Sequence, residues 1–201
     1  LDLGLSVQIT PATFSSKCHM DSSSKLTVYY AGYDTTSINT YIAALKRHKI
    51  GTVIDCRSSP NPSKRAEFKL KNVSKMCQEN GIKYSWKGEK FGGKHQQKKL
   101  LQTLCNNEAR VAEDFLCCIF SVVKQPSLIL CECANIQHCH CRHIADALLL
   151  YDIANIKTIS IPNEDANAAK CESYALSQDT KIKIIGYHPQ KAREQKRRNQ
   201  E

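Results

Sequence analysis

Residues 26–55 read LTVYYAGYDTTSINTYIAALKRHKIGTVID, and this stretch decides the fold. An apolar, strand-like run covers 26–31, a helical pattern covers 37–48, and a second short apolar run covers 52–55. A strand, a helix and a strand in this order favour a right-handed crossover between two parallel strands. The stretch therefore predicts a βαβ unit at the start of a parallel sheet.

The same alternation continues along the chain. Further strands are predicted at 83–86, 127–133 and 157–161, further helices at 72–80, about 98–124 and about 140–152, and an edge strand at 181–186. Strands that alternate with helices of this length predict the α/β class, as a Rossmann-like three-layer sandwich with a mainly parallel sheet. No G-x-G-x-x-G turn follows the first strand, so dinucleotide binding is not expected.

Composition divides the chain into one domain and two flanking segments. Residues 1–24 are Ser-rich and lack periodicity, which predicts a flexible N-terminal segment. Residues 25–188 are expected to form the α/β domain. Residues 189–201 are expected to form a basic C-terminal tail or helix.

The charge balance points to an anionic partner. Lys and Arg number 29 against 19 Asp and Glu, which gives a net charge of +10. A basic chain favours nucleic acid or a nucleotide as its partner. Part of the excess lies in the runs 94–99 and 191–198, so a solvated loop and tail would also account for it.

Two features of the sequence favour the cytoplasm. No stretch approaches the roughly 20 apolar residues that span a bilayer, and the first residues lack a secretion signal, so no membrane partner is expected. The 11 cysteines are odd in number and unevenly spaced, which favours reduced thiols over a disulfide scaffold.

Functional residues are expected in the loops that follow the strands, because ligands of open parallel sheets bind beyond the carboxyl ends of the strands. The loop after 52–55 carries Asp55 and Arg57, which could position a phosphate or a polar substrate. A structural salt bridge between the two is an equal alternative. The loop after the first strand carries Tyr33.

The loop after 127–133 is the strongest signal in the chain. Four thiols and three imidazoles lie within the 13 residues from 131 to 143, namely Cys131, Cys133, Cys139, Cys141, His138, His140 and His143. The helix N-terminus predicted there would lower the pKa of a thiol, and Arg142 would lower it further. Cys139 or Cys141 is therefore a candidate reactive thiolate, with His140 as its acid/base partner and Asp55 or Asp34 available to orient the histidine.

Two other chemistries fit the same thiols. Cys131, Cys133, Cys139 and Cys141 could bind tetrahedral zinc, although a C-x-C pair replaces the common C-x-x-C pair. A disulfide between Cys133 and Cys141 could instead act as a redox switch. A cysteine phosphatase loop is excluded by spacing, because Arg142 would require a cysteine at position 136, which is Ile136.

A set of motif residues runs in order through the chain, namely Asp55, Arg57, Pro60, Gly92, Gly93, Cys131, Cys139, His140, Ile144 and Ala145. With these residues the chain resembles the domain of unknown function 488 family, over roughly residues 25–161. Three positions depart from the family pattern: Tyr33 stands where the family has His, Cys133 where it has Glu, and Cys141 where it has Arg. The resemblance implies an α/β fold with a cleft at these loops and members that process nucleic acid or nucleotides, but no established reaction.

These observations lead to three hypotheses. The first is an enzyme that acts on a nucleotide or a nucleic-acid-derived substrate, with Cys139, His140 and Asp55 as catalytic residues. Its substrate contacts would be Arg57, Tyr33, Gly92, Gly93 and Arg142. The second is a zinc-stabilised module that binds nucleic acid or protein without catalysis. The third is a thiol redox sensor.

Overall fold

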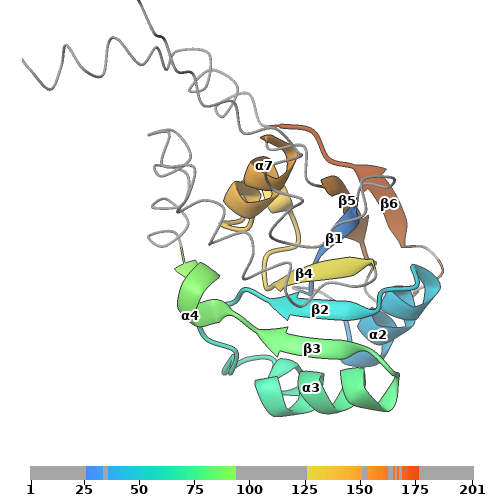
Figure 1. Ribbon diagram of the computed structural model, residues 1–201. Helices are drawn as coiled ribbons and strands as arrows, with labels where there is room; N and C mark the ends of the chain where they lie inside the picture. Colours follow the sequence, from blue (N-terminus) through green and yellow to red (C-terminus); the bar gives the residue numbers. More distant parts are fainter. Residues whose placement is uncertain are drawn as a thin grey trace, which may run out of the picture.

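The computed structural model describes residues 26–33, 36–93, 126–150, 154–162, 165, 167 and 169–176. Within these residues, one six-stranded sheet has the order β3-β2-β4-β1-β5-β6 (Figure 1). The strands are β1 (Leu26–Gly32), β2 (Thr52–Asp55), β3 (Lys83–Trp86), β4 (Ser127–Cys131), β5 (Ala154–Ser160) and β6 (Lys170–Ser173). The first five pair in parallel, and β6 pairs with β5 in the antiparallel sense.

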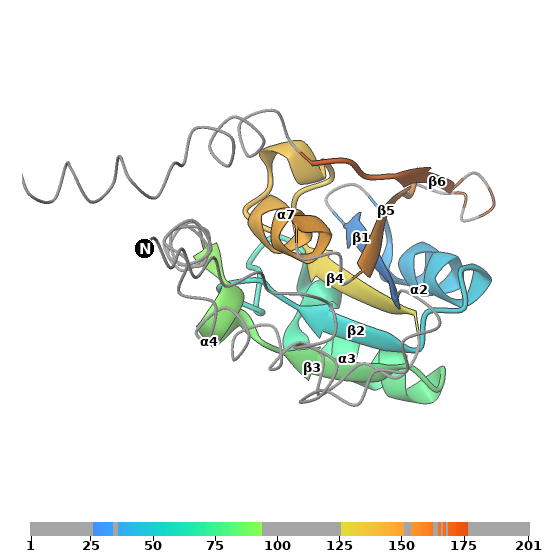
Figure 2. The same ribbon diagram turned by 45° about the horizontal axis from the view of Figure 1, so that its top comes forward.

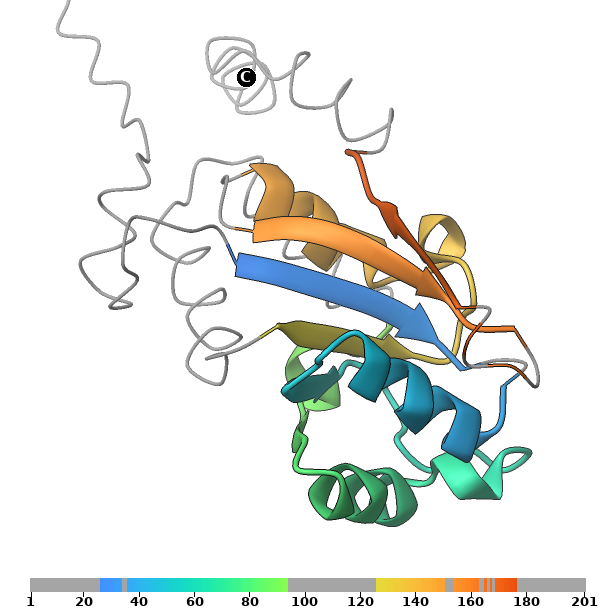
Figure 3. The ribbon, with the colours of Figure 1, turned by 90° about the vertical axis from the view of Figure 1, so that its right-hand side faces the viewer.

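Helices cover both faces of this sheet (Figures 2 and 3). The described helices are α2 (Ile38–Arg47), α3 (Leu70–Glu79), α4 (Gly88–Phe91) and α7 (Arg142–Leu150), with short 3-10 turns η1 (Ala66–Phe68) and η2 (Ile136–His138). Helices α2 and α3 lie against one face, and α7 lies against the other. The predicted α/β class and the Rossmann-like, mainly parallel sandwich are confirmed. None of the described helices is long and apolar enough to cross a membrane.

Strand alternation divides the buried side chains into two cores. The core beneath α7 contains Val28, Tyr30, Ile54, Ile129, Ile156, Ile144 and Leu148. The core beneath α2 and α3 contains Ala31, Val53, Leu128, Leu130, Leu45 and Val73. We call these the α7 face and the α2 face of the sheet. Each residue at the carboxyl ends of the strands is thereby assigned to one side.

The predicted helix at 37–48 shows how local sequence sets these elements. Ser37 is the N-cap of α2, and its side chain accepts a hydrogen bond from the backbone N–H of Thr40 at 3.2 Å. Tyr41, Ile42 and Leu45 recur at helical spacing and are buried, as expected for the apolar face of this helix. The helix ends at Arg47, so Lys46 and Arg47 lie in its last turn, where they complement the helix dipole.

Several element boundaries differ from those predicted. Strand β4 ends at Cys131 rather than at residue 133, because the chain turns after Cys131 and packs onto β1. Helix α7 begins at Arg142 rather than near residue 140, and β5 begins at Ala154 rather than at residue 157. Strand β6 was not predicted, since all four of its residues are exposed and it has no apolar alternation.

Some predicted segments lie outside the described residues. These are the flexible segment 1–24, the helix at 98–124, the edge strand at 181–186 and the basic tail at 189–201.

The topology reverses direction between β1 and β4. The chain leaves β1 through α2 toward β2, whereas it leaves β4 through α7 toward β5, on the opposite face and on the other side of β1. Ligands of open α/β sheets bind at such a reversal, beyond the carboxyl ends of the strands. Gly32 and Cys131 pair in register at this point, so the loop that follows Cys131 lies at the reversal.

Candidate metal centre

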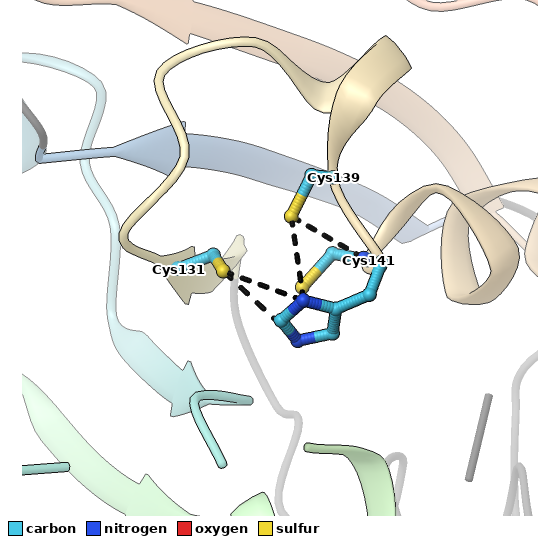
Figure 4. Close-up of side chains that lie close together, drawn as sticks. Cys131, Cys139 and Cys141 are labelled. Atoms are coloured by element: carbon cyan, nitrogen blue, oxygen red, sulfur yellow. Dashed lines mark hydrogen bonds between the residues drawn. The ribbon is translucent and has the colours of Figure 1, made fainter. Parts of the chain in front are cut away.

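Three cysteines and one histidine converge at the carboxyl end of β4. Cys131 is the last residue of β4, whereas Cys139, His140 and Cys141 immediately precede α7. Their ligand atoms all lie within 4.8 Å of one another, and Figure 4 shows the three thiols directed toward one another. The cysteines are 2%, 4% and 0% exposed in chain order, and His140 is partly buried. This group, the Cys3His cluster, could hold a metal ion.

The backbone between the cysteines brings the later thiols back to the strand. Asn135 caps η2 by accepting a hydrogen bond from the backbone N–H of Gln137 at 2.8 Å. Ile136 is buried in the core of the α7 face, which pins the loop to the sheet. The backbone N–H of Cys141 then donates to the Cys139 sulfur at 3.4 Å, in the turn that starts α7. The buried side chain of Ile136, the cap at Asn135 and the hydrogen bond to the Cys139 sulfur thus position the three cluster residues that precede α7.

The ring of His140 has a defined orientation. Its Nε2 lies 3.1 Å from the carbonyl oxygen of Cys56, and because a carbonyl can only accept, Nε2–H donates. In the neutral ring Nδ1 is then unprotonated, and it lies 3.9 Å from the sulfurs of both Cys131 and Cys139, whereas Nε2 lies 4.0 Å from the sulfur of Cys131. A histidine that donates one ring nitrogen to a backbone carbonyl and offers the other is the usual arrangement of a metal ligand.

The distances suit a tetrahedral ion. Around zinc, bonds of about 2.3 Å to sulfur and about 2.0 Å to nitrogen place neighbouring ligand atoms about 3.5–3.8 Å apart. The Nδ1-to-sulfur distances of 3.9 Å are close to that range, and the whole group lies within 4.8 Å. Small side-chain movements would therefore complete the coordination sphere without moving a strand or a helix.

The electrostatics of the cluster favour one thiolate. Hydrogen bonds from the thiols of Cys131 and Cys141, and a further one from His140, lower the pKa of Cys139 well below its ordinary value. Burial lowers the pKa of His140, but the hydrogen bond with Cys139 and the one with the Cys56 carbonyl outweigh it and raise that pKa to about 9. Both shifts favour a thiolate at Cys139 and an imidazolium at His140 when no metal is bound, and metal binding would displace the imidazolium proton.

Strand β1 holds the start of the loop in place. The hydroxyl of Tyr30 donates to the carbonyl oxygen of Cys133. That same oxygen would lie 1.8 Å from a Cβ added at Gly32, so only glycine allows this approach. Tyr30 and Gly32 of the neighbouring strand therefore hold the turn after Cys131 in position.

Two more thiols border the cluster without belonging to it. Hydrogen bonding with Cys131 and burial raise the pKa of the Cys133 thiol well above its ordinary value, and Cys133 is partly exposed. Cys56 is buried and its thiol contacts that of Cys141. The sequence-based ligand set of Cys131, Cys133, Cys139 and Cys141 thus differs at one place from the group that the structure brings together, where His140 stands instead of Cys133.

Asp55 and Arg57 lie on the opposite side of the sheet from this cluster. The guanidinium of Arg57 donates to Asp55 through Nε at 2.9 Å and through Nη2 at 2.5 Å, and Arg57 is 3% and Asp55 0% exposed. Arg57 also donates to the carbonyl of Phe68 at 2.7 Å, and Tyr84 donates to Asp55 at 2.5 Å. These contacts are typical of a structural salt bridge that fixes the loop after β2, the alternative that the sequence left open.

The other predicted substrate contacts are distributed over the carboxyl edge. Tyr33 is fully buried, stacks on Phe68 with ring centroids 4.0 Å apart and accepts a hydrogen bond from Arg57 at 3.2 Å. A Cβ at Gly92 would lie 2.5 Å from the Cα of Ser58, so this glycine serves close packing, whereas Gly93 has a φ of +79°, a backbone conformation that favours glycine.

Arg142 lies in the first turn of α7. Its Nη1 donates to the carbonyl of Gln137 at 3.2 Å. It lines a groove between η2 and the end of β6, together with Glu172, Ser173 and Tyr174.

Sequence reasoning missed the residues that support the cluster. Tyr30 holds the loop by its hydroxyl, and Cys56 orients His140 by its backbone carbonyl. Gly32 was a usable signal, because a glycine at the end of a strand can mark the close approach of another backbone segment. The contact between Cys56 and His140 joins residues 84 positions apart and has no local signal in the sequence.

Comparison with known proteins gives one family. The model of the family described as domain of unknown function DUF488 matches residues 37–148, more than half of the chain. Neither curated proteins nor solved structures yield a match. The matched segment runs from the N-cap of α2 to the last turn of α7 and so includes every residue of the Cys3His cluster. The chain belongs to the domain of unknown function 488 family.

Proposed function

We propose that the protein is a zinc-stabilised α/β module whose Cys3His cluster binds the metal through Cys131, Cys139, Cys141 and Nδ1 of His140. The observation that carries the proposal is the orientation of His140, whose Nε2–H is committed to the Cys56 carbonyl while Nδ1 lies 3.9 Å from the sulfurs of Cys131 and Cys139. Thiolate and imidazole ligands in a tetrahedral arrangement favour zinc over the harder cations.

The site has the character of a structural zinc site. Four protein ligands complete a tetrahedron, whereas catalytic zinc sites keep one position for water or substrate. The three cysteines are nearly inaccessible, which leaves little room for a fifth ligand. The metal would join the end of β4 to the start of α7 and, through His140, to the loop after β2. It would therefore stabilise the carboxyl edge of the sheet.

The proposed partner of the module is nucleic acid. The net charge of +10 supports a polyanionic partner, since phosphate contacts by Lys and Arg supply most of the affinity of nonspecific binding. The described cysteines are free thiols, which suits the reducing cytoplasm. Binding of a labelled single-stranded RNA or DNA, measured at several salt concentrations, should weaken steeply with salt. No binding even at low salt would exclude this partner.

A second candidate function is the enzyme predicted from the sequence. The lowered pKa of Cys139 beside a protonated His140 favours it, since such a pair is the usual nucleophile of cysteine enzymes. Asp55 and Arg57 would then act as positioning residues of the fold, because both are committed to each other and buried. A metal-free protein with one fast-reacting thiol at Cys139 would favour this candidate over zinc.

Cobalt substitution tests the metal site directly. Adding Co²⁺ to the reduced, metal-free protein should produce the strong visible absorption of tetrahedral Co²⁺ together with a thiolate-to-metal charge-transfer band. His140→Ala and Cys139→Ser should lose this spectrum. His138→Ala is the matched control, because His138 is exposed, lies two residues away and is outside the cluster.

Two results would count against the zinc proposal. One is an octahedral, thiolate-free cobalt spectrum. The other is an unchanged spectrum in His140→Ala, which would remove His140 from the ligand set.

A further inference from the structure

Most of the excess positive charge of the described residues lies at one edge of the sheet. Figures 1 and 2 show α3, β3 and α4 at this edge and α7, β5 and β6 at the opposite one. Residues 64–90, which we call the basic edge, carry eight Lys and Arg against three Glu, namely Lys64, Arg65, Lys69, Lys71, Lys75, Lys83, Lys87 and Lys90 against Glu67, Glu79 and Glu89. The described residues from 126 to 176 carry three Lys and Arg against four Asp and Glu. The β3 edge is therefore basic, whereas the β6 edge is nearly neutral.

The loop after β2 brings lysines from α3 and α4 to the same end of the basic edge. Strands β2 and β3 pair in parallel, so the segments that follow them leave the sheet side by side. The backbone N–H of Leu70 donates to the carbonyl of Pro60 at 2.8 Å, which holds the start of α3 against this loop. Gly92, at the end of α4, packs against Ser58 of the same loop. The exposed or partly exposed lysines of these segments are Lys64, Lys69, Lys71, Lys87 and Lys90.

The charges of α3 oppose its helix dipole. Acidic residues stabilise the amino end of a helix and basic residues its carboxyl end. Helix α3 instead has Lys69 as its N-cap, Lys71 in its first turn and Glu79 as its last residue. The Lys69 side chain makes no cap hydrogen bond, and within the described part of the chain neither lysine side chain has a partner. In α2, by contrast, Lys46 and Arg47 occupy the favourable last turn. The stability of the fold therefore accounts for the basic residues of α2 but not for Lys69 and Lys71.

An aromatic side chain belongs to the same edge. Trp86 is the one tryptophan of the chain, ends β3 and is partly exposed. Its Nε1–H donates to the carbonyl of Arg57 at 3.0 Å, so the indole ring has a defined orientation. Lys87 follows it directly. Lysines that contact phosphates, together with an aromatic ring on which a base stacks, are the usual means of binding single-stranded nucleic acid.

We propose that the basic edge is the surface on which a single-stranded nucleic acid binds, with Lys69 and Lys71 as phosphate contacts. This inference rests on the proposed nucleic-acid partner and assigns it a place on the fold. Phosphate contacts by lysine supply most of the affinity of nonspecific binding, and this explains why lysines occupy a helix end where they weaken the helix.

The test measures binding of a fluorescently labelled oligothymidylate to the full chain at several salt concentrations. The double variant Lys69→Gln/Lys71→Gln should bind more weakly than the wild type. The slope of log K against log salt concentration should become shallower by about 1.4, since each phosphate contact on a single strand contributes about 0.7. In urea the same variant should be as stable as the wild type or more stable, because two cations leave the amino end of α3.

Lys157→Gln/Lys170→Gln is the matched control. It removes the same charge from β5 and β6 at the opposite edge, so the salt slope should stay unchanged. Binding should also alter the fluorescence of Trp86 in the wild type, and added salt should reverse the change, because this residue lies within the basic edge.

The possible failures point to different causes. If the wild type binds no oligothymidylate even at low salt, both the nucleic-acid partner and its surface are wrong. If it binds but the two double variants have equal slopes, or if replacing the Lys and Arg of residues 191–198 by Gln removes the binding that Lys69→Gln/Lys71→Gln retains, only the surface is wrong. Equally tight binding of polyglutamate would make the partner of this edge an acidic protein and overturn the nucleic-acid assignment.

Discussion

His140 is the residue on which the interpretation of the cluster depends. Its contact with Cys56 assigns one ring nitrogen to the backbone and directs the other at the thiols. A histidine packed in a core without this contact would present either nitrogen to the thiols. The bond to Cys56 is therefore what turns a group of thiols into a candidate ligand set.

The titration of His140 tests its partnership with Cys139. In the reduced, chelator-treated protein its imidazole should titrate with a pKa of about 9, because the hydrogen bond with Cys139 outweighs burial. Nuclear magnetic resonance of the ring reports this value directly. Cys139→Ser should lower the midpoint, since it removes the thiolate that stabilises the imidazolium. A wild-type midpoint near the ordinary value of about 6.5 would contradict the pairing.

Arg57 should contribute strongly to stability rather than to binding. Arg57→Leu leaves the fully buried carboxylate of Asp55 without its cation, and breaking such a buried pair costs about 3–5 kcal/mol. Urea unfolding measures the loss. Lys75→Ala is the control, because the Lys75–Glu79 pair is 70% and 53% exposed and should contribute less than about 1 kcal/mol. Equal losses in the two variants would refute the structural role of Arg57.

At the residue scale, the sequence located the site but not its ligand set. The density of Cys and His between residues 131 and 143 was sufficient to find it, and three of the four cluster residues were already named as metal ligands. Alternation also predicted that Cys131 and Cys133 share a face. Alternation does not show how far the sulfurs of Cys131 and Cys133 lie from the residues at the start of α7. Cys133 is outside the group whose ligand atoms all lie within 4.8 Å of one another.

The contact between β1 and the loop after β4 is the element on which the cluster is built. Gly32→Ala would place a Cβ 1.8 Å from the Cys133 carbonyl, so the loop must shift. We expect a loss of about 1–3 kcal/mol in the free energy of unfolding and weaker binding of zinc or cobalt, measured by denaturation and by metal titration.

Gly81→Ala separates these two effects. Gly81 has a φ of +70° but no atom within 4 Å of an added Cβ. Its alanine variant should lose about 1–2 kcal/mol through backbone strain and retain full metal affinity. If Gly32→Ala bound metal as tightly as Gly81→Ala, the β1 contact would not position the cluster.

Strands with buried or half-buried residues could be predicted from the sequence, whereas the fully exposed strand could not. Strand β2 has the predicted bounds because turn residues flank a short buried run, and β3, which has one exposed and three partly buried residues, also has the predicted bounds. Strand β6 was missed since its four exposed residues carry no alternation and it exists through its pairing with β5. The end of β4 was placed two residues late because its position depends on Tyr30 and Gly32, which lie a hundred positions earlier.

The fold places on opposite faces of the sheet two pairs of residues that the enzyme hypothesis had assigned to one site. Asp55 and Arg57 belong to the α2 face, whereas Cys139 and His140 belong to the α7 face. Residues 55 and 56 are neighbours in the chain, yet their side chains point to opposite faces because β2 alternates. Cys56 contacts the cluster while Asp55 is committed to Arg57 and Tyr84. This separation favours a metal-stabilised module over an active site that uses all four residues.

Metal binding should stabilise the whole domain. An ion that binds the folded chain but not the unfolded one adds about 2.7 kcal/mol when its free concentration is a hundred times its dissociation constant. A chelator should therefore lower the unfolding midpoint of the reduced wild type, and restored zinc should recover it. Cys139→Ser should show a low midpoint that neither treatment changes. If chelator leaves the unfolding midpoint of the wild type unchanged, a bound ion does not stabilise the fold.

The metal content of the purified, reduced protein tests the central claim most directly. Native mass spectrometry gives the number of ions per chain, and thiol labelling of the same sample shows which cysteines are protected. The metal-centre account predicts one zinc per chain, with Cys131, Cys139 and Cys141 protected and Cys133 and Cys171 reactive. A metal-free chain with Cys139 as a single fast-reacting thiol would contradict it and favour the nucleophilic enzyme instead.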